Sequence, residues 1–294
     1  MKLVTLEDRS GRRIGVLQSE DGVVVDLAGQ RDLPREMADL IRLGDAGLEA
    51  ARAVVGEGTE RLPLDAVRLC APLPRPARNI FCVGKNYRAH AAEFHKSGFD
   101  ATARDALPEA PVVFTKAPST VIGPGEPIPA HLDPTNSVDY EGELAVVIGK
   151  GGRGITKADA FRHVYGYTLV NDVTARNLQH RHKQWFLGKS IDGFCPMGPT
   201  LVTADEVADV GALVLETRVG GELRQRAVVA DLIFDIPTLI ETISAGITLE
   251  SGDVIATGTP EGVGIGFDPP RFLRSGDRVA ITLQPIGTLE NPVS

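Results

Sequence analysis

Short apolar stretches with the character of β-strands recur throughout residues 72–294, and few helical patterns interrupt them. Helical spacing of apolar residues is confined to residues 157–163 and 237–244, where Pro237 suits the first turn of a helix. Because strands and helices do not alternate, the pattern predicts a β-rich α+β fold rather than a doubly wound parallel sheet. The strands are predicted at residues 80–83, 112–114, 144–148, 165–170, 213–219, 254–256 and 279–283.

Residues 1–71 have a pattern of their own and predict a small N-terminal α/β domain. Polar and glycine-containing turns separate strand patterns at residues 3–6, 14–17 and 23–27, and residues 35–55 then carry apolar side chains at roughly helical spacing. The stretch that follows, APLPRP at residues 71–76, contains prolines that cannot donate to a β-ladder and predicts a linker. We therefore expect two domains, residues 1–71 and residues 72–294.

Charge and hydropathy exclude several classes of protein. The formal net charge is −8 and no long basic run is present, which argues against nucleic acid as a partner. No apolar run approaches membrane-spanning length and the N-terminus lacks the apolar core of a signal peptide, so we expect a cytoplasmic protein that does not bind membranes. Cys70, Cys82 and Cys195 form no CxxC pair, which predicts reduced thiols rather than a zinc site or disulfides.

Two glutamates stand at the entry to the longest apolar run, in the sequence DYEGELAVVIG at residues 139–149. Glu141 and Glu143 are two residues apart, so a strand directs both carboxylates to the same face. Two like charges side by side are unfavourable unless a cation lies between them. A solvated strand face with two exposed acids explains the motif equally well, and the motif alone does not decide between these interpretations.

A third carboxylate follows another predicted strand. Asn171 and Asp172 come directly after residues 165–170, and by themselves they are typical of a turn or a helix N-cap. Together with the two glutamates, Asp172 completes a set of three carboxylates at strand ends. Oxygen ligands of this kind favour Mg²⁺, with Mn²⁺ or Ca²⁺ as alternatives, over zinc.

Two further motifs have both a functional and an ordinary interpretation. The sequence GKS at residues 188–190 resembles the end of a P-loop, but Lys183 stands where that motif requires glycine, so we reject a P-loop. Lys189 is then either a charge partner of the metal or a surface lysine. The glycine-rich stretch at residues 252–264 is either a tight turn or a turn whose backbone N–H groups face an anion.

A histidine and a glutamate form a candidate general base. If residues 84–93 are helical, His90 and Glu93 are neighbours on one face, and the carboxylate orients the imidazole. Taken alone, the pair is more typical of a helix surface, and His180 and His182 are alternative bases. Residues 94–110 are polar with scattered glycine and proline, which predicts a mobile loop of the kind that often covers an active site.

Considered together and in order, these segments resemble the fumarylacetoacetate hydrolase family. They run from Phe81 to Gly264 and cover most of the predicted larger domain. Each segment is a weak signal by itself, but the ordered set is specific to the family, and the last third of the chain is most similar to its shorter bacterial and mitochondrial domain-containing members. The segments are FCVGKNYRAHAAE, PVVFTK, VDYEGELAVVIG, NDVTARNLQ, WFLGKSIDGFCPMGP and GDVIATGTPEGVG.

The resemblance implies a mixed β-roll catalytic domain, a divalent metal, which we expect to be Mg²⁺, and a homodimer. The positions that match the family's metal ligands are Glu141, Glu143 and Asp172. Lys189 matches the family's lysine beside the metal, and His90 with Glu93 matches its catalytic dyad. The positions assigned to substrate binding are Arg88, Gln179, Gly258 and Thr259.

The resemblance also implies an activity. The expected reaction is metal-dependent hydrolysis of a carbon–carbon bond in an acylpyruvate-like 2,4-dioxo acid, with release of pyruvate. The alternatives are decarboxylation of a 2-oxo acid such as oxaloacetate, and isomerase or lyase action on a related 2-oxo, ureido or sugar acid. A metal- or ligand-binding protein without turnover is a further alternative, against which the His90–Glu93 pair argues.

Overall fold

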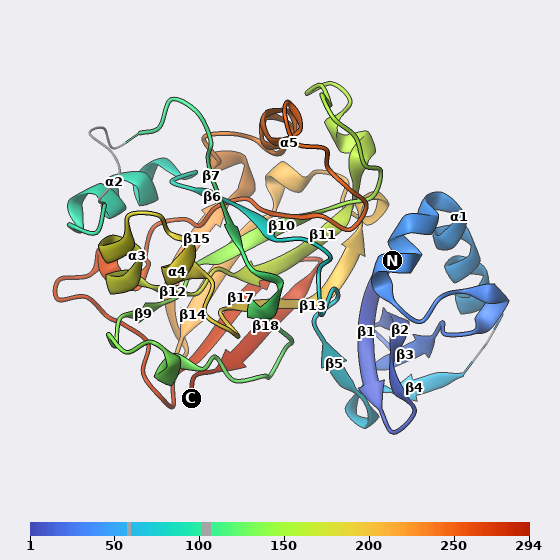
Figure 1. The fold of residues 1–294 in the computed structure, drawn as a ribbon. Helices are drawn as coiled ribbons and strands as arrows, with labels where there is room; N and C mark the ends of the chain where they lie inside the picture. Colours follow the sequence, from blue (N-terminus) through green and yellow to red (C-terminus); the bar gives the residue numbers. More distant parts are fainter. Residues whose placement is uncertain (58–59, 101–106) are drawn as a thin grey trace.

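β-Sheets form the centre of the structure (Figure 1), a computed structural model that describes residues 1–57, 60–100 and 107–294. Within these ranges a twelve-stranded sheet consists of β1 (Lys2–Asp8), β2 (Gly11–Gln18), β3 (Val23–Asp26), β4 (Arg61–Pro63), β5 (Arg68–Cys70), β6 (Ile80–Gly84), β7 (Val112–Lys116), β8 (Val121–Ile122), β10 (Gly142–Ile148), β11 (Val164–Asn171), β13 (Cys195–Thr203) and β16 (Val254–Ala256). Its strand order is β4-β3-β2-β1-β13-β11-β10-β16-β6-β7, and β5 and β8 pair with β1 and β13. This β-rich α+β architecture agrees with the fold class expected from the sequence.

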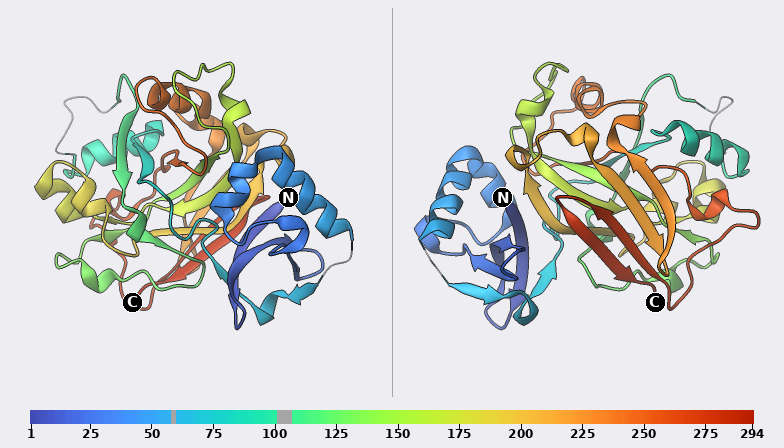
Figure 2. Two further views of the ribbon diagram at one scale, coloured as in Figure 1. Left: turned by 45° about the vertical axis from the view of Figure 1, so that its right-hand side comes forward. Right: turned by 180° about the vertical axis from the view of Figure 1, so that it is seen from behind.

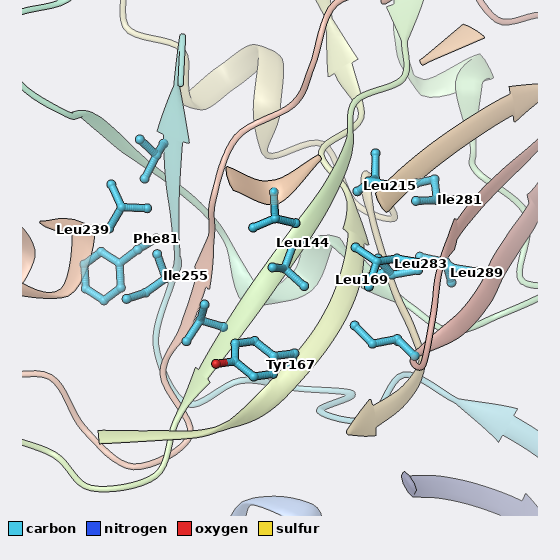
Figure 3. Close-up of a cluster of buried hydrophobic side chains, with 14 of the residues drawn as sticks. Phe81, Leu144, Tyr167, Leu169, Leu215, Leu239, Ile255, Ile281, Leu283 and Leu289 are labelled. Carbon is cyan, nitrogen blue, oxygen red and sulfur yellow. The ribbon is translucent and has the colours of Figure 1, made fainter. Parts of the chain in front are cut away.

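A second, four-stranded sheet packs against the middle of the first. Its order is β15-β14-β17-β18, formed by β14 (Val214–Val219), β15 (Glu222–Val228), β17 (Arg278–Leu283) and β18 (Gly287–Pro292). Leucines from β10 and β11 meet apolar side chains of β14, β17 and β18 in the main core (Figure 3). All residues of β10 and β11 are buried, so their near-continuous apolar sequences are explained by contacts on both faces.

Gly142, on the strand that carries the glutamates, lies directly against the second sheet. A Cβ added to this residue would lie 2.2 Å from Thr217 Oγ1 and 3.3 Å from Gln225 Oε1. Gln225 Oε1 also accepts a hydrogen bond from the Gly142 N–H at 3.1 Å. The residue between the two glutamates therefore packs against the second sheet and has no room for a side chain.

Five α-helices lie outside the sheets within the described residues: α1 (Met37–Gly56), α2 (Arg88–Lys96), α3 (Arg176–His182), α4 (Phe186–Lys189) and α5 (Ile236–Ser244). The helix predicted at residues 237–244 is confirmed as α5, in which Asp235 caps the Thr238 N–H and Pro237 lies in the first turn. The α-helix predicted at residues 157–163 is wrong, because only a 3₁₀ turn forms at Ala160–His163 before β11 begins at Val164.

The N-terminal strands and α1 gather at one side of the molecule, where Figure 2 shows them in blue. They are nevertheless joined to the rest by main-chain pairing, since β1 runs antiparallel to β13 with Leu3 opposite Leu201. One apolar cluster also extends from α1 through Leu73 to Ala145 and Val147 of β10. The division into domains at residue 71 stays a prediction, and the larger sheet runs across it.

Helix α2 alters the prediction for residues 94–110. Phe94 is a buried residue of this helix, and the helix continues to Lys96. The first residues of the predicted loop are therefore helical. Residues 101–106 of the predicted loop lie outside the described residues. In the described part of the chain, no helix combines the length and apolar character needed to cross a membrane.

Candidate metal centre

The ends of two paired strands bring three carboxylates together. Strands β10 and β11 are antiparallel, with Gly142 opposite Asn171, so the start of one strand lies beside the end of the other. As a result, Glu141, Glu143 and Asp172 each offer an oxygen within 4.8 Å of the other two, and all three are buried. Their burial excludes the alternative of a solvated strand face.

Backbone groups hold these carboxylates in place. The Glu141 N–H donates to Asn171 Oδ1 at 3.0 Å, and the Asp172 N–H donates to the Glu141 carbonyl at 2.8 Å. On the other side, the Gly258 N–H donates to Glu143 Oε2 at 2.8 Å. At Gly258, the anion that the glycine-rich stretch faces is therefore Glu143. Gly258, which was assigned to substrate binding, orients this carboxylate and is not among the residues that line the cavity described below.

Two buried lysines neutralise part of this negative charge. Lys189 Nζ lies 2.8 Å from Glu141 Oε2 and 2.8 Å from Asp172 Oδ2, which excludes the alternative of a surface lysine. Lys116 Nζ donates to Asp172 Oδ1 at 2.7 Å and to the Val173 carbonyl at 2.9 Å. Lys116 ends β7 and was missed by the sequence analysis, which had no reason to pair it with residue 172.

The charge distribution leaves a deficit of positive charge at Glu143. Burial raises the pKa of Glu141, but Lys189 and Arg176 outweigh burial and lower this pKa to about 2. By contrast, burial together with Asp172 and Glu141 raises the pKa of Glu143 well above its usual value. None of the described residues forms a salt bridge with Glu143. The carboxylate set therefore fits a divalent cation with oxygen ligands, because such a cation would supply the missing charge.

Arg176, at the start of α3, is a second residue that the sequence analysis missed. Its Nε donates to Asp139 Oδ2 at 2.9 Å, and its Nη1 lies 2.7 Å from Glu141 Oε1 and 3.2 Å from Gln179 Oε1. Nη2 is buried and has no hydrogen-bond partner among the described residues. A buried guanidinium with one unused donor arm is a ready site for an anionic or carbonyl oxygen.

These groups share one small cavity. Its free volume is about 10 Å³, which is room for roughly one water molecule. Helix α2 contributes His90 to its wall, and Gln179 and Thr259, which the resemblance assigns to substrate binding, also line it. The lining residues are Val83, Gly84, Lys85, His90, Phe94, Phe114, Glu141, Glu143, Arg176, Gln179, Trp185, Lys189 and Thr259.

Arg88 does not join this set. It is exposed on α2, two residues before the buried His90, and residues two apart on a helix face nearly opposite sides. Its assignment to substrate binding is therefore not supported by its position. His180 and His182, the alternative bases, are exposed on α3 and do not line the cavity either.

The histidine and glutamate of α2 are paired as their spacing suggested. His90 Nδ1 lies 3.2 Å from Glu93 Oε2, and His90 is buried. Because Nδ1 is engaged, Nε2 is the ring nitrogen that is left to exchange a proton in the cavity. A surface position, the ordinary interpretation of this pair, does not apply to His90.

Fold and site together define a class of β-rich proteins with a candidate divalent-metal site built from carboxylates at strand ends. A profile described as "Fumarylacetoacetate (FAA) hydrolase C-terminal" matches residues 79–294, and the chain belongs to the fumarylacetoacetate hydrolase family. Oxaloacetate tautomerase YisK of Bacillus subtilis (strain 168) is 57% identical to it over 236 residues, which are 80% of this chain and 76% of that protein.

Solved structures agree with this assignment. Fumarylacetoacetate hydrolase EaFAH from psychrophilic Exiguobacterium antarcticum is 43% identical, with a TM-score of 0.84 over 100% of this chain and 99% of the other. Maleylpyruvate hydrolase from Sphingobium sp. SYK-6, solved in complex with manganese(II) ion and pyruvate, is 33% identical, with a TM-score of 0.81 over 100% of this chain and 98% of the other. The family thus includes relatives with different reactions on small oxo acids.

Proposed function

We propose that this chain is a metal-dependent enzyme that interconverts the keto and enol forms of a four-carbon 2-oxo dicarboxylic acid of the oxaloacetate type. The observation that carries the proposal is Arg176, which lines the cavity that holds the carboxylate set and whose buried Nη2 has no hydrogen-bond partner among the described residues. A substrate with two carboxylates can address the metal with one end and this cationic donor with the other. The name of the Bacillus relative, oxaloacetate tautomerase, supports the same substrate class.

Glu141, Glu143 and Asp172 are the residues that would hold the cation. We propose Mg²⁺, with Mn²⁺ or Ca²⁺ as alternatives, because all three ligands are carboxylate oxygens. When bound, the cation supplies Lewis-acid stabilisation of negative charge on the 2-oxo group. Lys189 adds a further positive charge beside the same carboxylates. The manganese ion of the Sphingobium relative supports a divalent metal.

His90 is the proposed base. Glu93 holds Nδ1, so Nε2 can take a proton from the carbon next to the 2-oxo group and return a proton to the resulting enol oxygen. Only a C–H bond breaks and an O–H bond forms, so no water or second substrate is consumed. Gln179 and Thr259 are proposed to hold substrate oxygens, because both line the cavity.

The proposal is tested by following loss of the enol absorbance of oxaloacetate with the wild-type protein in Mg²⁺. His90→Ala should lower the rate by roughly 10²-fold or more, because a general base contributes that much. EDTA should abolish activity, and added Mg²⁺ or Mn²⁺ should restore it. A rate of tautomerisation equal to that of buffer alone would refute the proposal.

A second candidate is hydrolysis of an acylpyruvate, which was the first expectation from the sequence. It is favoured by the same His90–Glu93 pair, which could activate a water molecule, and by the likeness to maleylpyruvate hydrolase. Release of pyruvate from a panel of 2,4-dioxo acids distinguishes the two reactions. Decarboxylation is tested by adding oxaloacetate to the panel and measuring the CO₂ that is released.

A further inference from the structure

A glycine-rich turn encloses the carboxylate of Glu93. The Gly262 N–H lies within hydrogen-bonding distance of both oxygens of this carboxylate, 3.0 Å from Oε1 and 3.3 Å from Oε2. Gly266 closes the other side so tightly that an added Cβ would lie 1.8 Å from Glu93 Oε1. The three atoms nearest to that Cβ all belong to the Glu93 side chain, at Oε1, Cδ and Cγ.

Hydrogen bonds to Asp139 and Tyr140 hold the turn in place. The Tyr140 hydroxyl donates to the Gly262 carbonyl at 2.7 Å. Asp139 accepts from the Gly264 N–H at 2.6 Å and from the Ile265 N–H at 3.1 Å. Asp139 is in turn fixed by Arg176. An added methyl group at Gly266 therefore cannot be accommodated by a retreat of the turn without breaking several buried hydrogen bonds.

The carboxylate of Glu93, by contrast, borders an open groove into which it can move. A groove of about 690 Å³ runs along the outer side of α2 and is lined by Glu93, Gly266, Lys96 and Phe267 among others. Gly266 does not have a positive φ, so alanine fits its backbone conformation. The low-energy response to an added methyl group is rotation of Glu93 outward into this groove, away from His90.

We infer that the turn Gly262–Gly266 is the positioning element of the base: it fixes Glu93 so that Oε2 faces His90 Nδ1, and Gly266 must lack a side chain for this to happen. The residues of the turn act through Glu93 and have no contact with substrate in this assignment. The catalytic consequence rests on the proposed function, whereas the structural consequence does not. Neither the tautomerase proposal nor the hydrolase alternative assigns a role to Gly266.

The test is a double-mutant cycle on the full-length, metal-loaded protein. Gly266→Ala should lower kcat by about tenfold or more, since orienting the base is part of its roughly 10²- to 10⁴-fold contribution, and should leave KM within about twofold. In a Glu93→Ala background, Gly266→Ala should have no further effect on kcat. Gly246→Ala is the matched control, because no atom of the described residues lies within 4 Å of the added Cβ there. It should behave like the wild type.

Independent effects of the two substitutions on kcat, or wild-type kcat for Gly266→Ala, would overturn the inference. A crystal structure of Gly266→Ala gives a readout that needs no activity. The Glu93 carboxylate should leave the Gly262 N–H and enter the groove while the turn stays in place. A displaced turn with Glu93 unmoved also overturns the inference. If Glu93→Ala and His90→Ala keep wild-type kcat, the proposed base fails, and the crystal structure still decides the positioning role.

Discussion

Glu143 is the proposed metal ligand with the least compensating charge around it. Lys189 lies between Glu141 and Asp172, and Lys116 pairs with Asp172, whereas within the described part of the chain Glu143 accepts a hydrogen bond only from the Gly258 N–H. Burial raises the pKa of this carboxyl, and the charges of Asp172 and Glu141 raise it further because no lysine or arginine among the described residues pairs with it. The protein thus leaves one ligand for the cation itself to stabilise.

Binding of Mg²⁺ should therefore release a proton. The pKa of Glu143 in the metal-free protein lies well above its usual 4.5, so the group holds a proton at pH values above 4.5 that the cation must displace. Mg²⁺ affinity should accordingly rise with pH and level off above the raised pKa. Calorimetry in buffers of different ionisation enthalpy measures the release. An affinity that is constant from about pH 5 to 9 would contradict this account.

Lys116 gives a second prediction at this scale. Removing one partner of a buried ion pair costs about 3–5 kcal/mol, so Lys116→Met should destabilise the metal-free protein by roughly that amount. Mg²⁺ should recover part of the loss, because the cation compensates Asp172 in place of the lysine. Urea unfolding with and without Mg²⁺ measures both values, and Lys150→Met at an exposed position is the control. Equal losses with and without metal would argue against a shared charge balance.

At the scale of elements, a small aromatic cluster fixes α2 over the cavity. Trp185 packs edge-on against Phe94 of α2 at a centroid distance of 5.9 Å and against Phe114 of β7 at 5.1 Å. Gly84 makes room for it, since an added Cβ would lie 2.4 Å from the indole ring. Trp185 therefore links the helix that carries His90 to the edge of the sheet.

Trp185→Ala should loosen α2. A large buried aromatic truncated to alanine costs about 3–5 kcal/mol, and the loss here falls on the contact between α2 and β7. Amide hydrogen exchange in Arg88–Lys96 should accelerate, and kcat should fall further than Mg²⁺ affinity does. Trp185→Phe keeps an aromatic ring, so its exchange rates in α2 and its kcat should lie between those of the wild type and those of Trp185→Ala. Unchanged exchange in α2 would show that other contacts hold the helix.

The sequence patterns predicted the strands well because a strand buried on both faces leaves an unmistakable apolar run, as in β10 and β11. They missed β13, the strand that joins the N-terminal region to the core, because Pro196 and Pro199 lie within it and proline is rare in central strands. Helices α3 and α4 span 7 and 4 residues, too few for a helical period to be visible.

At the site, too, some residues could be predicted from the sequence and others could not. Glu141 and Glu143 are separated by a single residue, and this spacing in a strand is enough to predict that their carboxylates share a face. Arg176 and Lys116 could not be assigned in this way, because each meets its partner only through tertiary packing, Arg176 at Asp139 and Lys116 at Asp172. A clue was present in principle: three buried carboxylates require buried cations, and these two residues lie at the end of β7 and at the start of α3.

For the whole molecule, we propose that residues 72–294 cannot fold well alone, although the sequence divides at residue 71. Without residues 1–71, the edge of β13 loses its pairing with β1, and apolar side chains such as Val147 lose part of their cover. A fragment of residues 72–294 should be aggregation-prone. Co-expression of residues 1–71 should recover soluble material. A monodisperse fragment with wild-type Mg²⁺ affinity would contradict this view.

A homodimer is the assembly we expect. Strand β7 is an edge of the large sheet, and Val113 on it, with Phe186 and Leu187 on the adjacent α4, exposes apolar surface. Light scattering at micromolar concentration should give twice the monomer mass of 31.3 kDa. Leu187→Glu should shift the mass towards the monomer. A monomer mass for the wild type would rule out a stable dimer.

Gly142 has a consequence for how this scaffold can change over time. The residue between two proposed metal ligands is also one of the points where the two sheets touch, so a substitution there disturbs the core and the metal site in one step. A sequence that keeps this fold therefore also keeps the distance between the two glutamates. New substrates on this scaffold should arise from changes in the outer wall of the cavity, around Trp185 and α2. A library that randomises residue 142 should return glycine from every selection for soluble protein.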